Sequence, residues 1–195
     1  MKLAFIPSAP LLLPALGGGP DDLRSACQHA ISCLDGDVVV IGSGRPTGWC
    51  SGTVDATPYG LRGEPAAHPL PLALAVGSAL LGERPHRLLA VDGRPVELPA
   101  GADLLVVGDG TAKRTEKAPG HFDPRAEAYD EAVVAGLRAG RLPDLDVALG
   151  RELLVGGLDA WCTVAASVPG RFTADVRYAG APYGVGYVVA TWIGS

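Results

Sequence analysis

Histidine is scarce in this 195-residue chain, and its four imidazoles do not form a metal-binding pattern. His29, His68, His86 and His121 include no H-x-H, H-x-x-x-H or H-E-x-x-H group, the spacings that place two ligands on one face. We expect structural or solvated roles for the first three. His121 is the one imidazole that we consider for proton transfer, because its loop lies on the same side of the predicted sheet as Asp109.

Two glycine-rich segments follow predicted strands, but neither has the residue order that binds a nucleotide. Residues 42–48 (GSGRPTG) carry their third glycine one place too late for a dinucleotide fingerprint, and Pro46 keeps the chain turning where a helix should begin. Residues 108–114 (GDGTAKR) lack the order of a P-loop. Both segments remain candidate pocket edges, because ligands in open α/β sheets bind beyond the carboxyl ends of strands.

Nucleophile and thiol chemistry have no local signature either. The chain has no G-x-S-x-G elbow, and its four cysteines form no C-x-x-C pair or zinc template. A chain with 48% hydrophobic residues does not need disulfides to fold, so we expect reduced thiols and a cytoplasmic location. Residues 1–19 superficially look like a signal peptide, but three prolines interrupt the apolar run.

Composition excludes several classes of protein. The net charge is −5 and no block of Lys and Arg occurs, so we expect no nucleic-acid partner. No run of 18 apolar residues is present, so no membrane span is predicted. The hydrophobic content excludes a disordered chain, and the length suits one domain.

The elements that position the candidate residues are predicted from apolar patterning. Short apolar runs predict strands at residues 2–6, 37–41, 88–91, 104–107, 171–178 and 183–193. Helical spacing predicts helices at residues 21–34, 70–81, 124–139 and 152–168. Residues 42–69 are rich in turn formers and predict a long surface excursion.

Strands that alternate with helices are typical of α/β proteins. We therefore predict a single α/β domain over residues 1–195, with three α/β/α layers and a mostly parallel central sheet. A C-terminal strand pair is expected, joined at residues 180–182. A strand near residues 187–192 would be exposed and would offer an edge for pairing between copies of the chain.

Three segments, in order along the chain, resemble one family. They are residues 6–14 (IPSAPLLLP), residues 108–124 continuing to Tyr129 and Asp130, and residues 180–187 (GAPYGVGY). Together they are similar to the superfamily of class III extradiol ring-cleavage dioxygenases, which also includes the Memo-like proteins. Short bacterial members are the most similar. The resemblance implies a non-haem Fe(II) held by two His and one Glu, with a further His as acid/base.

The chain departs from this family at the positions of the iron site. Ser8 and Gly44 stand where the resemblance implies the two ligand histidines, and Ala112 stands at the acid/base histidine. Val155 aligns with the ligand Glu, with Glu152 one turn away. Ser, Gly and Ala offer no imidazole nitrogen to Fe(II). The resemblance therefore implies the fold without its iron, and we expect no cofactor.

Three functional hypotheses follow. The first is a pseudoenzyme that keeps a pocket for a small anionic or aromatic ligand. The second is an active extradiol-type oxidoreductase with a rearranged Fe(II) site, built from His121, Asp109 and either Glu152 or Asp159. The third is a homo-oligomeric scaffold that uses no pocket. The pocket candidates under the first hypothesis are Ser8, Ser43, Arg45, Asp109, Thr111, Lys113, His121 and Tyr183.

Overall fold

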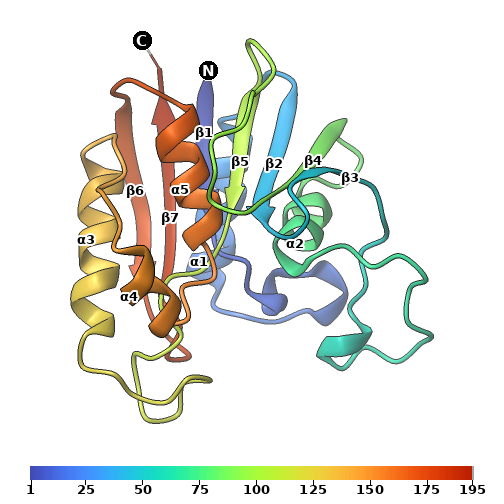
Figure 1. Ribbon diagram of the computed structural model, residues 1–195. Coiled ribbons are helices and arrows are strands. Elements are labelled where there is room, and N and C mark those ends of the chain that lie inside the picture. The colour runs from blue at the N-terminus through green and yellow to red at the C-terminus, as the bar shows by residue number, and fades with distance from the viewer. Residues whose placement is uncertain (195) are drawn as a thin grey trace.

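A seven-stranded mixed sheet forms the centre of the computed structural model, which describes residues 1–194 (Figure 1). The order across the sheet is β3-β4-β2-β5-β1-β7-β6. The strands are β1 (Lys2–Ile6), β2 (Val38–Ser43), β3 (Gly48–Cys50), β4 (His86–Val91), β5 (Asp103–Val107), β6 (Thr173–Gly180) and β7 (Tyr187–Ile193).

Parallel pairing is confined to the middle of the sheet. The strands β4, β2, β5 and β1 run parallel to one another, whereas β3 pairs antiparallel with β4, and β7 pairs antiparallel with both β1 and β6. The predicted α/β domain is confirmed, but the sheet is mixed, with as many antiparallel as parallel pairings among the strands described.

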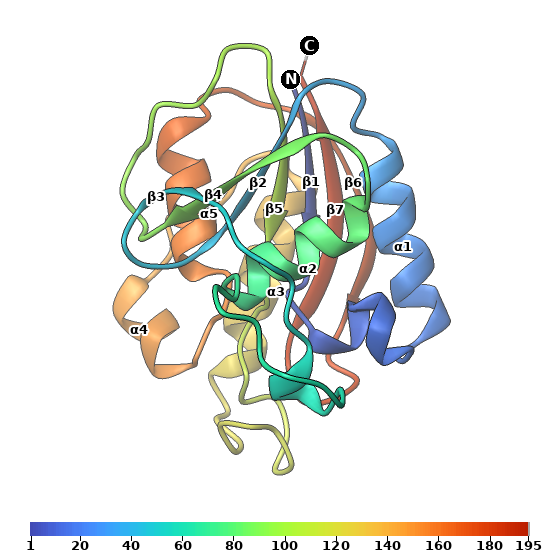
Figure 2. The ribbon, with the colours of Figure 1, turned by 90° about the vertical axis from the view of Figure 1, so that its right-hand side faces the viewer.

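Helices pack on both faces of this sheet (Figure 2). One apolar cluster contains residues of α1 (Asp21–Ser32) and α2 (Leu72–Leu81), and the other contains residues of α3 (Ala126–Arg138) and α5 (Leu158–Ser167). The strand β2 shows why: Val38 and Val40 face the first cluster, while Val39 and Ile41 face the second. A continuous apolar run is what a strand buried on both faces requires.

The helix predicted at residues 152–168 is wrong, because the segment is interrupted by a turn. Residues 152–168 do not form one helix, because α4 (Val147–Glu152) ends before a turn and α5 begins at Leu158. Leu154 in that turn has φ of 57°, which is incompatible with a right-handed helix. At the same turn Gly157 passes very close to Gly108, where an added Cβ would lie 2.2 Å from the Gly157 Cα atom. A tertiary contact therefore breaks a pattern that looks helical.

Two further predictions about the sheet are corrected. The segment 42–69, predicted as a surface loop, contains the strand β3. Its three residues are too few to show an alternating apolar pattern. The strand β7 is not an exposed edge, because it lies between β1 and β6, and its Trp192 is 2% exposed. The edge strands are β6 and β3. No helix within residues 1–194 is long and apolar enough to cross a membrane.

Asp103 joins the start of β5 to the beginning of the chain. Its buried carboxylate accepts hydrogen bonds from the backbone N–H groups of Lys2 at 2.7 Å, and of Asp35 and Gly36 at 3.0 Å each. Burial opposes the ionised form, but these hydrogen bonds outweigh it and hold the pKa of Asp103 below its usual value.

A lowered folded-state pKa predicts how stability depends on pH. The contribution of Asp103 is present above the unfolded pKa of about 4 and is lost as pH falls through the folded value. We expect Asp103→Asn to lower the free energy of unfolding by about 1–3 kcal/mol at pH 7 and by less at pH 3. Urea unfolding at the two pH values measures this, with the exposed Asp144→Asn as control. Equal losses at both pH values would contradict it.

Candidate functional site

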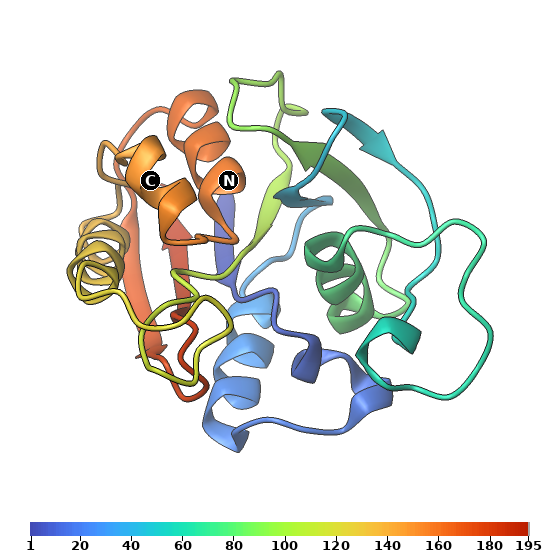
Figure 3. The ribbon, with the colours of Figure 1, turned by 60° about the horizontal axis from the view of Figure 1, so that its bottom comes forward.

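The carboxyl ends of the parallel strands lie at one end of the molecule, where loops from distant parts of the chain gather (Figure 3). The segment after β5 runs between the segment after β1 and the β6–β7 turn. The Gly108 N–H donates to the Ile6 carbonyl at 2.9 Å, and the Arg114 N–H donates to the Gly184 carbonyl at 3.0 Å. The Gly186 N–H donates back to the Thr111 carbonyl at 2.8 Å.

A cavity of about 480 Å³ opens at this place. Most of its lining is apolar or aromatic, and Asp109 contributes its one carboxyl group. The volume lies in the range of small-molecule sites, which are apolar with a few placed polar groups. The lining residues are Pro10, Leu11, Asp109, Ala112, Pro119, Leu154, Gly156, Tyr183, Val185 and Tyr187. We call this the Asp109 cavity.

Asp109 has an unusual protonation equilibrium. The Ser8 N–H donates to Asp109 Oδ1 at 2.7 Å, and the Gly157 N–H donates to the Asp109 carbonyl at 2.7 Å. Burial raises the pKa of Asp109 to about 6, although hydrogen bonds from the side chain and backbone of Ser8 act in the opposite direction. Near neutral pH the carboxyl group can therefore accept a hydrogen bond from a ligand or donate one.

Backbone strain is concentrated beside this cavity. Leu154 and His121, with φ of 57° and 60°, are the two non-glycine residues within the described part of the chain that have positive φ. Leu154 lines the cavity, and His121 follows the cavity-lining Pro119 by two residues. This conformation costs about 1–2 kcal/mol for an L-residue, and such costs are tolerated most often at functional sites.

Exposed apolar side chains occur in the same loops. Leu154 and Tyr183, both cavity residues, are each 51% exposed, and so is Phe122 in the loop that contains Pro119. Large apolar side chains exposed beside a concave site are typical of a surface that binds a ligand or another protein.

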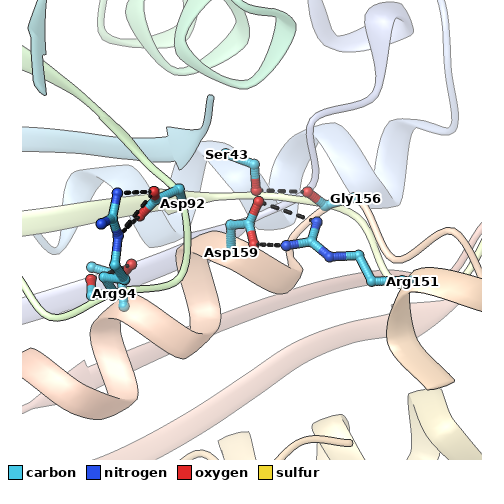
Figure 4. Close-up of polar contacts among 7 residues, drawn as sticks. Ser43, Asp92, Arg94, Arg151, Gly156 and Asp159 are labelled. Carbon is cyan, nitrogen blue, oxygen red and sulfur yellow. Dashed lines mark hydrogen bonds and ion pairs between the residues drawn. The ribbon is translucent and has the colours of Figure 1, made fainter. Parts of the chain in front are cut away.

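The structure brings some of the predicted site residues to the cavity. Asp109, Ala112 and Tyr183 line it directly. Ser8 is buried behind Asp109 and holds its carboxylate through the 2.7 Å hydrogen bond. Ser43, at the end of β2, donates from Oγ to the carbonyl of the cavity residue Gly156 at 2.9 Å (Figure 4). Ser43 therefore supports the wall without lining the cavity.

Gly44 does not join this group. A Cβ added there would meet the Cβ of Ala90 at 3.1 Å and Pro71 Cγ at 3.6 Å, so the position faces α2 and β4. Ala112 lines the cavity and Ser8 contacts Asp109 from behind it, but Gly44 is directed elsewhere. Val155 is buried, and it is absent from the cavity lining.

The remaining pocket candidates point away from the cavity or stay outside its lining. Thr111 is fully buried and donates from Oγ1 to Asp130 Oδ2 at 2.9 Å. Arg45 and His121 are exposed, and Lys113 lies against Gly120; none of the three belongs to the lining. The two cations that suggested an anionic ligand are thus not in the wall.

The alternative iron ligands are not assembled. Glu152 pairs with Arg125 at 3.0 Å, and Asp159 forms two hydrogen bonds with the Arg151 guanidinium (Figure 4). No three His, Cys, Asp or Glu side chains within residues 1–194 are grouped so that they could hold a metal ion. Neither this donor set nor the family positions Ser8, Gly44, Ala112 and Val155 fits an Fe(II) site.

Sequence reasoning missed several cavity residues. Leu11, Val185 and Tyr187 lie within the segments that carry the family resemblance. Their place in those segments is the signal that could have identified them as cavity residues. Leu154 gave no signal, because its exposure depends on the left-handed turn between α4 and α5.

Comparisons with known proteins give a fold but no family. No protein-family model matches the chain, and no curated protein matches it. A solved structure, the uncharacterized protein JW3007 from Escherichia coli K12, is similar over 100% of both chains with a TM-score of 0.56 and 17% sequence identity. At this identity the similarity establishes a shared α/β fold alone.

The raised pKa of Asp109 predicts a pH effect opposite to that of Asp103. A folded pKa of about 6, above the unfolded value of about 4, favours the folded state at acid pH, and this advantage is lost as pH rises through 6. Between pH 4.5 and 7.5 we expect wild type to lose roughly 1–2 kcal/mol relative to Asp109→Asn. Urea unfolding at both pH values measures the difference. Parallel behaviour of the two proteins would contradict a perturbed Asp109.

Proposed function

We propose that this protein is a member of the class III extradiol dioxygenase superfamily without iron-dependent ring cleavage, and that it binds a small aromatic ligand in the Asp109 cavity. The observation that carries the proposal is an apolar and aromatic cavity with one carboxyl group at the ends of the parallel strands. The three segments that resemble the family supply residues to it: Pro10 and Leu11, Asp109 and Ala112, and Tyr183 and Val185.

The proposed loss of iron chemistry follows from the lack of suitable metal-ligand atoms at the cavity. Ser8 and Ala112 lie at the cavity, and neither offers an imidazole nitrogen. Asp109 already accepts a hydrogen bond from the Ser8 N–H, and Glu152 and Asp159 are paired with arginines. With these partners the cavity has no set of ligands for Fe(II).

The wall favours an aromatic ligand over a simple anion. Tyr183, Tyr187 and Leu154 offer flat or apolar surface, whereas Arg45 and Lys113 lie outside the lining. A ligand with a phenolic hydroxyl would add a hydrogen bond to Asp109, whose pKa of about 6 allows it to accept or donate near neutral pH. The substrate class of the superfamily, a hydroxylated ring, has the same chemistry.

Fold and location complete this proposal. A three-layer α/β/α arrangement with β6 and β7 as C-terminal pair is supported by the apolar clusters on both faces and by the β6–β7 ladder. A cytoplasmic location is supported by the four cysteines, all of which are free. Neither a nucleic acid nor a membrane is part of the proposal.

The binding proposal predicts that phenol and catechol bind without added metal. Isothermal titration should give a saturable heat with one site, and Tyr183→Ala should weaken binding about 3–10-fold because it removes part of the aromatic wall. Tyr59→Ala, an exposed tyrosine outside the cavity, is the matched control and should bind like wild type. No saturable binding, or equal effects of the two variants, would overturn the proposal.

The loss of iron chemistry predicts that protein prepared anaerobically with added Fe(II) retains no stoichiometric iron after desalting. Metal analysis measures the iron, and absorbance of the ring-opened product measures catechol cleavage. One iron per chain that disappears in Asp109→Asn, or turnover of catechol, would establish the rearranged iron site instead.

A further inference from the structure

A second cavity, also of about 480 Å³, lies at the β3 edge of the sheet and shares no lining residue with the Asp109 cavity. It is formed by β3 and the two residues after it, the first residues of β4, and Ser78 of α2. Its lining residues are Trp49, Cys50, Ser51, Gly52, Ser78, His86, Arg87 and Leu88. We call this the Ser78 cavity.

Ser78 and His86 are hydrogen-bonded to each other in its wall. The Ser78 Oγ atom lies 2.9 Å from His86 Nε2, and His86 Nδ1 lies 2.6 Å from the carbonyl oxygen of Arg84. A carbonyl oxygen can only accept a hydrogen bond, so Nδ1 carries the proton. In the neutral ring Nε2 is then the acceptor, and the Ser78 hydroxyl donates to it.

This arrangement has the three parts of an activated serine. A hydroxyl nucleophile contacts a base, and a third group fixes the tautomer and orientation of the base. The third group is the Arg84 backbone carbonyl in place of a carboxylate. Both side chains are partly exposed in the cavity, so a substrate can reach them.

Neighbouring packing fixes the geometry of the pair. Gly77, which precedes Ser78 on α2, is buried so closely against the sheet that an added Cβ would lie 2.5 Å from Val40 Cγ1. His86 begins β4, whose register with β2 pairs it with Val38. A nucleophile and base held on a packed helix and a sheet strand keep their separation more accurately than groups on loops.

The remaining lining of the cavity comes from both faces of the sheet. The exposed Trp49 ring offers a flat apolar surface, and the Arg87 guanidinium lies 4.8 Å from its centroid. Strand alternation places Arg87 and Trp49 on the face of the sheet opposite to His86 and Leu88, so this pair forms the far rim of the cavity and does not contact the Ser78–His86 pair. The matching substrate is a small ester with a good leaving group, because the serine–histidine pair supplies the nucleophile and the base.

We propose that the Ser78 cavity hydrolyses small carboxylic esters, with Ser78 as nucleophile and His86 as general base. The Ser78 Oγ atom forms a bond to the ester carbonyl carbon while His86 Nε2 takes the hydroxyl proton. The ester C–O bond then breaks, and the alkoxide or phenolate leaves with that proton. Water, activated by His86, attacks the acyl-serine, releases the acid and restores Ser78 and His86.

The test uses p-nitrophenyl acetate as substrate and a fluorophosphonate as covalent probe. We expect release of p-nitrophenol by wild type, and a loss of about 100-fold or more in Ser78→Ala and in His86→Gln. The exposed Ser25→Ala and His29→Gln are matched controls and should keep rates close to wild type. The histidine control is needed because surface histidines also hydrolyse this ester slowly. Peptide mapping should place the phosphonyl group on Ser78.

A second variant separates misfolding from loss of the nucleophile. Ser78→Cys keeps a nucleophile beside His86, and we expect its new thiol to react with iodoacetamide faster than any of the four native cysteines. Combination with His86→Gln should remove that advantage. Labelling at another serine, equal hydrolysis by Ser78→Ala and wild type, or a slow new thiol would each overturn the proposal. None of these outcomes depends on ligand binding in the Asp109 cavity.

Discussion

The buried carboxylate of Asp130 is the interaction on which the cavity end of the molecule depends. From α3 it accepts hydrogen bonds from the N–H and Oγ1 of Thr111 at 2.8 and 2.9 Å, and it pairs with Arg114 at 3.1 Å. Burial raises the pKa of Asp130, and these three donors oppose that effect. Its oxygens also occupy the space that a side chain at Gly110 or Gly186 would need. One carboxylate thus fixes both the segment after β5 and the β6–β7 turn.

The Asp109 cavity exists because that segment is fixed. Thr111 is directed at Asp130, whereas Asp109 and Ala112 of the same segment line the cavity. The close approach of Gly108 to Gly157 brings in the turn between α4 and α5, which presents Leu154 in a left-handed conformation. Burial of Asp109 among these segments raises the pKa of its carboxyl group.

The two proposed sites use different parts of the same sheet. The Asp109 cavity lies beyond the carboxyl ends of β1 and β5, where α/β proteins place their ligands. The Ser78 cavity lies at the edge formed by β3 and β4, where α2 and the first residue of β4 meet. The first site lacks the metal ligands for the iron chemistry that its family resemblance implies. The second has a serine hydrogen-bonded to a histidine, an arrangement that no sequence motif indicates.

The sequence by itself determined the strands other than β3 and most of the helices. A continuous apolar run such as residues 38–41 indicates a strand that is buried on both faces of a sheet. The sequence also determined that imidazole is missing at Ser8 and Ala112, since this depends on residue identity alone. Only the tertiary structure decided that residues 152–168 are broken by the Gly108–Gly157 contact, and that Thr111 and Gly44 face away from the cavity. It alone decided that Ser78 meets His86, because the distance between two side chains depends on how a helix packs on a sheet, which local patterning does not encode.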